Sequence, residues 1–147
     1  MTLERVGVVI IRAGHVALIE RQNGGRRYWV IPGGGVETGE TLAEAAQREA
    51  AEELGVNVEL GALRVCIDHR EKDGSVQRQW YYDAVVRSEQ IRIIGPEVDR
   101  ANSGNYRAVW IDLDKLELGA THPSAIAQLI SRNRGLWPEE LITIDEV

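Results

Sequence analysis

The segment that most constrains this chain is residues 32–56, in which a run of glycines leads directly into a glutamate-rich stretch. Thr41 followed by Glu44 has the spacing of a capping box, which marks the start of a helix. Residues 42–54 are mostly strong helix formers. Gly55 is placed to end that helix in a left-handed conformation. The segment therefore predicts a glycine-rich loop followed by a helix over residues 42–54.

Three glutamates of the expected helix lie on one face. Glu49, Glu52 and Glu53 are spaced i, i+3 and i+4. Carboxylates this close raise one another's pKa, and a divalent cation held by oxygen ligands, Mg²⁺ or Mn²⁺, relieves the repulsion. The alternative interpretation is a solvated acidic face with Arg48 as an ordinary ion-pair partner. From the helix alone, the solvated face is the commoner situation.

The glycine run changes that balance. Glycines at 33–35 allow the backbone to approach a ligand closely and to adopt positive φ angles. A loop of this kind offers carbonyl oxygens to a metal ion or amide groups to a phosphate. Its position next to the acidic helix favours a ligand site over a solvated helix face.

The spacing across residues 34–56 resembles the box of the Nudix hydrolase family. That box is a glycine, five residues, a glutamate, seven residues, and then Arg-Glu-hydrophobic-x-Glu-Glu-x-Gly-hydrophobic. Every spacing fits, and the departure is Ala50, where a bulkier aliphatic residue is usual. The matching positions are Gly34, Glu40, Arg48, Glu49, Glu52, Glu53, Gly55 and Val56.

The resemblance implies a metal-dependent hydrolase that cleaves the pyrophosphate linkage of a nucleoside diphosphate linked to a group X. The expected substrate is a small nucleotide, of the nucleoside triphosphate or nucleotide-sugar type, and the expected cofactor is Mg²⁺ or Mn²⁺. Two alternatives remain, a catalytically silent Nudix-fold nucleotide-binding or regulatory domain and a 5′-end RNA pyrophosphohydrolase. The complete box counts against the first, and the absence of a basic stripe counts against the second.

The resemblance also assigns roles to individual residues. Glu49, Glu52, Glu53 and the carbonyl of Gly33 are expected to bind the metal, and Glu49 or Glu53 to take a proton from the attacking water. Arg48 is expected to orient a catalytic glutamate through a charge-assisted hydrogen bond. The residues expected to set the geometry of the loop and the helix are Gly34, Glu40 and Gly55.

One catalytic position of the family has no counterpart here. Many members carry a further acidic residue near position 104 or 107, where this chain has Gly104 and Arg107. Glu97 and Asp99 belong to the preceding loop and are the remaining acidic candidates. We take Glu97 as the expected distal base.

Residues outside the box are candidates for substrate binding. Arg26 and Arg27 precede the strand that enters the glycine run and are expected to hold phosphate or ribose. Arg78 lies on a later strand that is expected to face the same site. Aromatic residues on strands can stack on a base but more often belong to the core. They are Trp29, Trp80 and Tyr82.

Length and charge bound the remaining choices. The 147 residues fit a single domain spanning 1–147, and the net charge of −6 argues against broad nucleic-acid or anionic-membrane binding. The single Cys66 excludes an internal disulfide and suits a reducing compartment. No apolar stretch is long enough to span a bilayer. We expect a cytoplasmic protein.

The order of elements predicts an α+β fold, an α/β/α sandwich with a mixed sheet between helices. The phase of the apolar pattern slips near Gly61, which predicts a bulge. A second helix is expected to start near Pro123 and to end at Gly135. The tail from Leu136 is expected to pack as a last strand or to cross to a partner chain, as in a homodimer. Strands are expected at residues 6–12, 15–21, 28–31, 56–67, 76–87, 91–94 and 106–111.

Overall fold

The computed structural model describes residues 2–86 and 105–146. Two α-helices and one short 3-10 helix occur among its strands. The helices are α1 (Leu42–Leu54), η2 (Leu113–Lys115) and α2 (Ser124–Asn133). The strands are β1 (Thr2–Arg12), β2 (His15–Asn23), β3 (Arg26–Val30), β4 (Gly33–Gly35), β5 (Val58–Arg70), β6 (Val76–Val86), β7 (Asn105–Asp112), β8 (Thr121–His122) and β9 (Ile142–Glu146).

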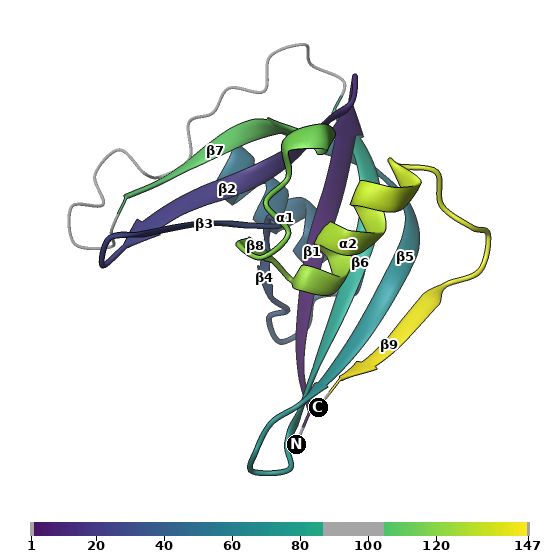
Figure 1. Ribbon diagram of the computed structural model, residues 1–147. Helices are drawn as coiled ribbons and strands as arrows, with labels where there is room; N and C mark the ends of the chain where they lie inside the picture. Colours follow the sequence, from purple (N-terminus) through teal and green to yellow (C-terminus); the bar gives the residue numbers. More distant parts are fainter. Residues whose placement is uncertain (1, 87–104, 147) are drawn as a thin grey trace.

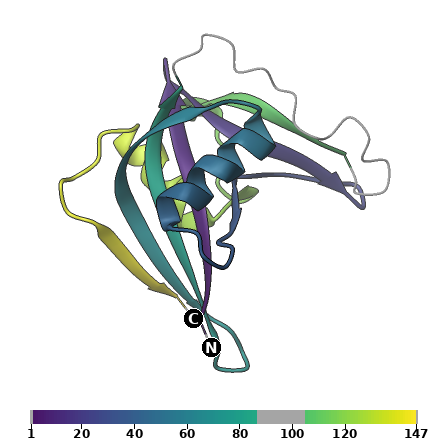
Figure 2. The same cartoon turned by 180° about the vertical axis from the view of Figure 1, so that it is seen from behind.

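The strands form a mixed sheet whose hydrogen-bonded order is β8-β3-β2-β1-β6-β5-β9, with β4 paired to β1 and β7 paired to β2. In Figure 1, β2, β3 and β7 reach to one side, while β1, β5, β6 and β9 converge toward the chain ends. Helix α2 lies in front of the sheet in Figure 1, and Figure 2 shows α1 on the opposite face. The expected α+β sandwich is therefore confirmed.

Each face of the sheet carries its own hydrophobic core. The α1-side core joins Leu54 and the α1 alanines to inward residues of β1 and β2, such as Val8 and Ile19. The α2-side core joins Ile126 and Ile130 to Leu18 on the other face of β2. Because side chains alternate along a strand, these two cores define which face of the sheet each strand residue occupies.

The long strands expected from the sequence are present, although the bounds of β1, β2 and β5 differ from the expected ones by two to four residues. β1 and β2 form a hairpin in which Arg12 pairs with His15, and Ala13 and Gly14 of its turn have φ angles of 50° and 75°. These positive angles at both central positions are those of a type I′ turn, which suits the twist of a hairpin. The β5–β6 register shifts between Leu60 and Leu63, so the bulge expected near Gly61 is present.

Helix α1 has the expected bounds. The Thr41 hydroxyl accepts a hydrogen bond from the Glu44 N–H at 3.0 Å, and the Glu44 carboxylate accepts one from the Thr41 N–H at 2.9 Å. Gly55 follows the helix with a φ of 69°. Helix α2 ends at Asn133, and both Arg134 and Gly135 follow it with positive φ angles, of 53° and 92°, so the expected end at Gly135 is late by one residue.

The glycine run is not the loop that the sequence predicts. Gly33, Gly34 and Gly35 form β4, which pairs antiparallel with Arg5 to Gly7 of β1. None of these three glycines has a positive φ angle. A side chain at Gly33 would collide with the Val6 carbonyl. These glycines therefore provide close approach between backbones and not unusual backbone angles.

The C-terminal tail forms β9, which runs parallel to β5 within the same chain. The strand expected at 91–94 and the expected distal base Glu97 lie outside the described residues. Within residues 2–86 and 105–146, neither α-helix is long and apolar enough to cross a membrane.

Candidate active site

Two glutamates of α1 point at β4. The Glu53 Oε1 atom accepts a hydrogen bond of 2.7 Å from the Gly33 N–H. A Cβ atom added to Gly34 would lie 2.8 Å from Glu49 Oε1 and closer still to the rest of that carboxylate. The absence of side chains on β4 therefore allows both carboxylates to approach its backbone.

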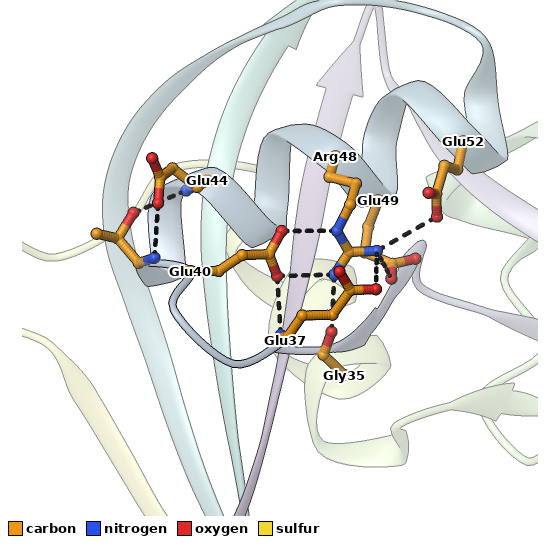
Figure 3. A network of polar contacts seen from close by, with 8 residues as sticks. Gly35, Glu37, Glu40, Glu44, Arg48, Glu49 and Glu52 are labelled. Atoms are coloured by element: carbon orange, nitrogen blue, oxygen red, sulfur yellow. Dashed lines mark hydrogen bonds and ion pairs between the residues drawn. The ribbon is translucent and has the colours of Figure 1, made fainter.

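Arg48 ties the segment before α1 to the helix, as Figure 3 shows. Its Nε and Nη2 atoms donate to the two oxygens of Glu40 at 2.7 and 2.9 Å, and Nη2 also donates to the Gly35 carbonyl at 2.9 Å. Its Nη1 atom donates to Glu49 Oε2 at 2.8 Å and to Glu52 Oε1 at 3.3 Å. The guanidinium thus fixes the orientation of Glu49 relative to β4.

Glu40 is held as a carboxylate. Hydrogen bonds from Arg48, and a further one from the Glu37 N–H at 2.8 Å, lower the pKa of Glu40 to about 2. Glu37 itself is exposed, with 68% of its side chain accessible, and lies 3.7 Å from Arg48. The contacts of Glu40 therefore join the segment before α1 to the helix.

The pKa of Glu53 is shifted in the opposite direction to that of Glu40. Burial, with a smaller contribution from the charge of Glu49, raises its pKa to about 7, although the hydrogen bond from the Gly33 N–H and the charges of Arg21 and Arg5 oppose the rise. The neighbouring N–H group and arginines therefore only partly offset the burial of Glu53 and its repulsion by Glu49. Such a pair binds a cation favourably, because a cation offsets both the repulsion and the loss of hydration.

The donor atoms suit a hard divalent cation. Mg²⁺ binds oxygen ligands, commonly one or two carboxylates together with water and substrate phosphates. Glu49, Glu53 and the β4 backbone supply such oxygens, whereas the Glu52 side chain is 58% exposed and held by Arg48. In the part of the chain that the structure describes, no three Asp, Glu, His or Cys side chains are gathered as a complete metal site. The residues present fit an ion that completes its coordination with substrate and water.

The substrate-binding candidates from the sequence are dispersed. Arg26 and Arg27 are exposed at the start of β3, and neighbours along a strand point to opposite faces of the sheet. Arg78 donates to both oxygens of Asp68, at 2.7 and 3.0 Å. It lines a cavity of about 380 Å³ with Cys66 and residues of β9. The Arg78 guanidinium is therefore engaged by Asp68 of the neighbouring strand β5.

Trp29 belongs largely to the α2-side core, against which it packs. Its Nε1 atom donates to Glu20 Oε1 at 3.1 Å, and its ring lines a cavity of about 190 Å³ with Ile111 and Thr121. Trp80 packs against the α1-side core and donates to Glu4 Oε2 at 2.6 Å. Both tryptophans therefore have structural contacts that account for their positions.

Two arginines that the sequence analysis did not select act on Glu53. Arg5 and Arg21 both oppose the rise in its pKa. The Arg21 guanidinium lies over the ring of Tyr106, with its carbon 5.1 Å from the ring centroid. Their proximity to α1 depends on the pairing of distant strands. The one local feature of the sequence that could have identified Arg21 as a site residue is its charge at the end of an apolar run.

Comparison with known proteins agrees with this geometry. The sequence model of the NUDIX domain matches residues 1–131. An "oxidized purine nucleoside triphosphate hydrolase" from Danio rerio is 32% identical over 111 residues, covering 74% of this chain and 65% of that protein. The chain thus spans just under two thirds of the length of this relative.

Solved structures show the same fold. A MutT NUDIX hydrolase from Burkholderia pseudomallei is 29% identical, with a TM-score of 0.67, and the match covers 86% of this chain and 95% of that one. A NUDIX hydrolase from Nitrosomonas europaea matches with a TM-score of 0.73 at 20% identity, covering 97% of this chain and 78% of that one. The family match, the complete box on α1 and the approach of its glutamates to β4 agree. The chain belongs to the Nudix family.

Proposed function

We propose that this chain is a metal-dependent pyrophosphohydrolase that cleaves the pyrophosphate linkage of a nucleoside diphosphate linked to a group X. The observation that carries this proposal is the pair of Glu49 and Glu53, held against β4 with Glu53 largely withdrawn from water. An isolated pair of carboxylates repels phosphate. The pair supports this reaction only in combination with a cation.

Glu49, Glu52, Glu53 and the Gly33 carbonyl are our proposed ligands for Mg²⁺ or Mn²⁺. When bound, such an ion neutralises charge on the phosphates and lowers the pKa of a bound water. Glu49 or Glu53 accepts the proton of the attacking water. Arg48 positions Glu49, to which it donates a hydrogen bond of 2.8 Å.

The remaining assignments are proposals of the same kind. Gly34, Glu40 and Gly55 set the geometry of β4, the connecting segment and the end of α1. Arg26 and Arg27 lie at the exposed start of β3 and are proposed to contact phosphate or ribose. Arg78 remains a weaker substrate candidate because Asp68 occupies two of its donors. Glu97 remains our prediction for the distal base. A cytoplasmic location and a homodimer also remain predictions.

The proposed substrate class is supported by the relatives. The Danio rerio protein is described as acting on oxidized purine nucleoside triphosphates. That description, the acidic net charge of −6 and the arginines on β2 and β3 together favour a small nucleotide over a nucleic acid. We therefore propose a nucleoside triphosphate or a nucleotide sugar as substrate.

A substrate screen tests the proposal directly. The protein is incubated with nucleoside triphosphates, nucleotide sugars and 5′-triphosphorylated RNA in Mg²⁺, and released phosphate and pyrophosphate are measured separately. We expect hydrolysis of a small nucleotide that stops in EDTA and is lost in Glu53→Gln. Glu44→Gln is the matched control, because it is an exposed helix position where glutamine preserves the capping box. Turnover without a divalent ion, or full activity of Glu53→Gln, contradicts the proposal.

A further inference from the structure

A row of three side chains crosses the face of the sheet next to the α1 glutamates. Arg21 of β2 pairs in register with Tyr28 of β3 on one side and Tyr106 of β7 on the other. Ile19, two residues before Arg21, belongs to the α1-side core, and Tyr106 packs against that core. Because alternate residues share a face, all three side chains lie on the α1 face of the sheet.

The row continues the core outward. Its neighbouring row on the same face consists of Val30, Ile19 and Ala108, which are paired in register and belong to or pack against the α1-side core. Tyr28 and Arg21 are half-buried, so they occupy the boundary between this core and solvent. An aromatic–arginine–aromatic row at such a boundary can contact a ligand without leaving the protein core unfilled.

The position of Arg21 suits the binding of an anion. Its guanidinium carbon lies 5.1 Å from the centroid of the Tyr106 ring, a cation–π distance that orients the guanidinium plane. It forms no salt bridge with a carboxylate of residues 2–86 or 105–146, unlike Arg48, Arg64, Arg78 and Arg107. Ile19, two residues before Arg21 on the same face of β2, lies in one core with Ala50 and Leu54 of α1, the helix that carries Glu49 and Glu53.

The position of Tyr28 suits stacking on the planar ring of a ligand. Among the described residues, the one aromatic ring that it contacts is that of His122 of β8, which meets it edge-on with centroids 6.0 Å apart and an interplanar angle of 73°. His122 pairs in register with Val30 and so lies on the same α1 face. An edge-on neighbour leaves a ring face available for stacking, and the π-face of any nucleobase can use it.

We propose that Tyr28, Arg21 and Tyr106 form one binding row, in which Tyr28 stacks on the heterocycle of the substrate and Arg21 donates to a phosphate oxygen. Tyr106 holds the guanidinium in place by lying beneath it. This inference rests on the proposed function and deepens it. It requires a substrate with an aromatic ring next to its phosphates, and it disfavours polyphosphates that lack a ring.

Direct binding tests the row without depending on turnover. Calorimetry in Mg²⁺ measures the affinity of four nucleoside monophosphates, with adenine, guanine, cytosine or uracil, and of inorganic pyrophosphate, which has no ring. Tyr28→Leu removes the ring, and Tyr28→Phe keeps it as the matched control. We expect Tyr28→Leu to weaken the best monophosphate about tenfold or more and to leave pyrophosphate binding within twofold. Tyr28→Phe should resemble the original protein.

The Arg21→Gln variant separates the two contacts. We expect it to weaken monophosphate and pyrophosphate alike, since both carry the phosphate that Arg21 binds. Thermal melting of every variant confirms that the fold is retained. The row is refuted if Tyr28→Leu leaves the ratio of monophosphate to pyrophosphate affinity unchanged, whether both affinities stay or both fall. Nucleotide binding that depends on Tyr28, without any hydrolysis, contradicts the proposed function alone.

Discussion

Replacing Glu53 with glutamine should stabilise the metal-free protein at alkaline pH. Burial raises the pKa of Glu53 from 4.5 to about 7. The folded state therefore holds this proton more tightly than the unfolded state does. Below pH 4.5 the group is protonated in both states and costs nothing. As the pH rises toward 7, ionisation favours unfolding, and above pH 7 the full penalty applies.

The size of this penalty follows from the pKa. One unit of pKa difference between the two states corresponds to about 1.4 kcal/mol, so the rise at Glu53 destabilises the alkaline protein by about 3 kcal/mol. Glutamine is nearly isosteric and can still accept the 2.7 Å hydrogen bond from the Gly33 N–H. Because glutamine does not titrate, Glu53→Gln should remove the pH-dependent penalty and keep the contact.

Urea denaturation in EDTA at pH 5.0 and pH 8.5 measures this effect. The free energy of unfolding of Glu53→Gln, relative to the original protein, should increase by about 2.5 kcal/mol between the two pH values, because a small part of the penalty is already present at pH 5.0. All other titrating groups are shared and cancel in the difference. Glu44→Gln, an exposed position of the same helix, should show no comparable increase. A difference for Glu53→Gln that is independent of pH would refute the assigned burial of this carboxylate.

Three further changes test the site and its support. Gly34→Ala should lower the affinity for a divalent cation with little loss of melting temperature, because the added methyl group displaces only the end of the flexible Glu49 side chain. Gly35→Ala is the control: its methyl group meets nothing within 4 Å, so its effect on cation affinity should be much smaller. Thr41→Ala should lower the free energy of unfolding in urea by about 1 kcal/mol through loss of the helix cap, and Thr41→Ser should not. Leu54→Ala should cost about 2–5 kcal/mol in the same assay, because Leu54 is fully buried; a loss below 1 kcal/mol would contradict its place in the core.

Features set by local sequence were predictable. The bounds of α1 follow from Thr41, Glu44 and Gly55, whose capping interactions involve only neighbouring residues. The β1–β2 hairpin and the bulge near Gly61 likewise follow from turn chemistry and from the phase of apolar residues. In each case the physical cause lies within a few residues of its effect.

Features set by strand pairing were not predictable from one sequence. The glycine run forms β4 because β1 lies beside it, and this partner is distant in the chain. Arg78 is bound by Asp68 across β5 and β6, and Arg21 reaches the vicinity of Glu53 through the packing of β2 near α1. Register between distant strands decides these contacts, and no local pattern encodes it.

The central claim is that Glu49 and Glu53, held against β4, bind a divalent cation that in turn binds pyrophosphate. Titration calorimetry with Mn²⁺ and Mg²⁺, with and without a non-hydrolysable nucleotide, measures this most directly. We predict binding to the original protein and to Glu44→Gln, and loss of binding in the double variant Glu49→Gln/Glu53→Gln. Undiminished cation binding by the double variant, or no binding by the original protein under either condition, would contradict the account.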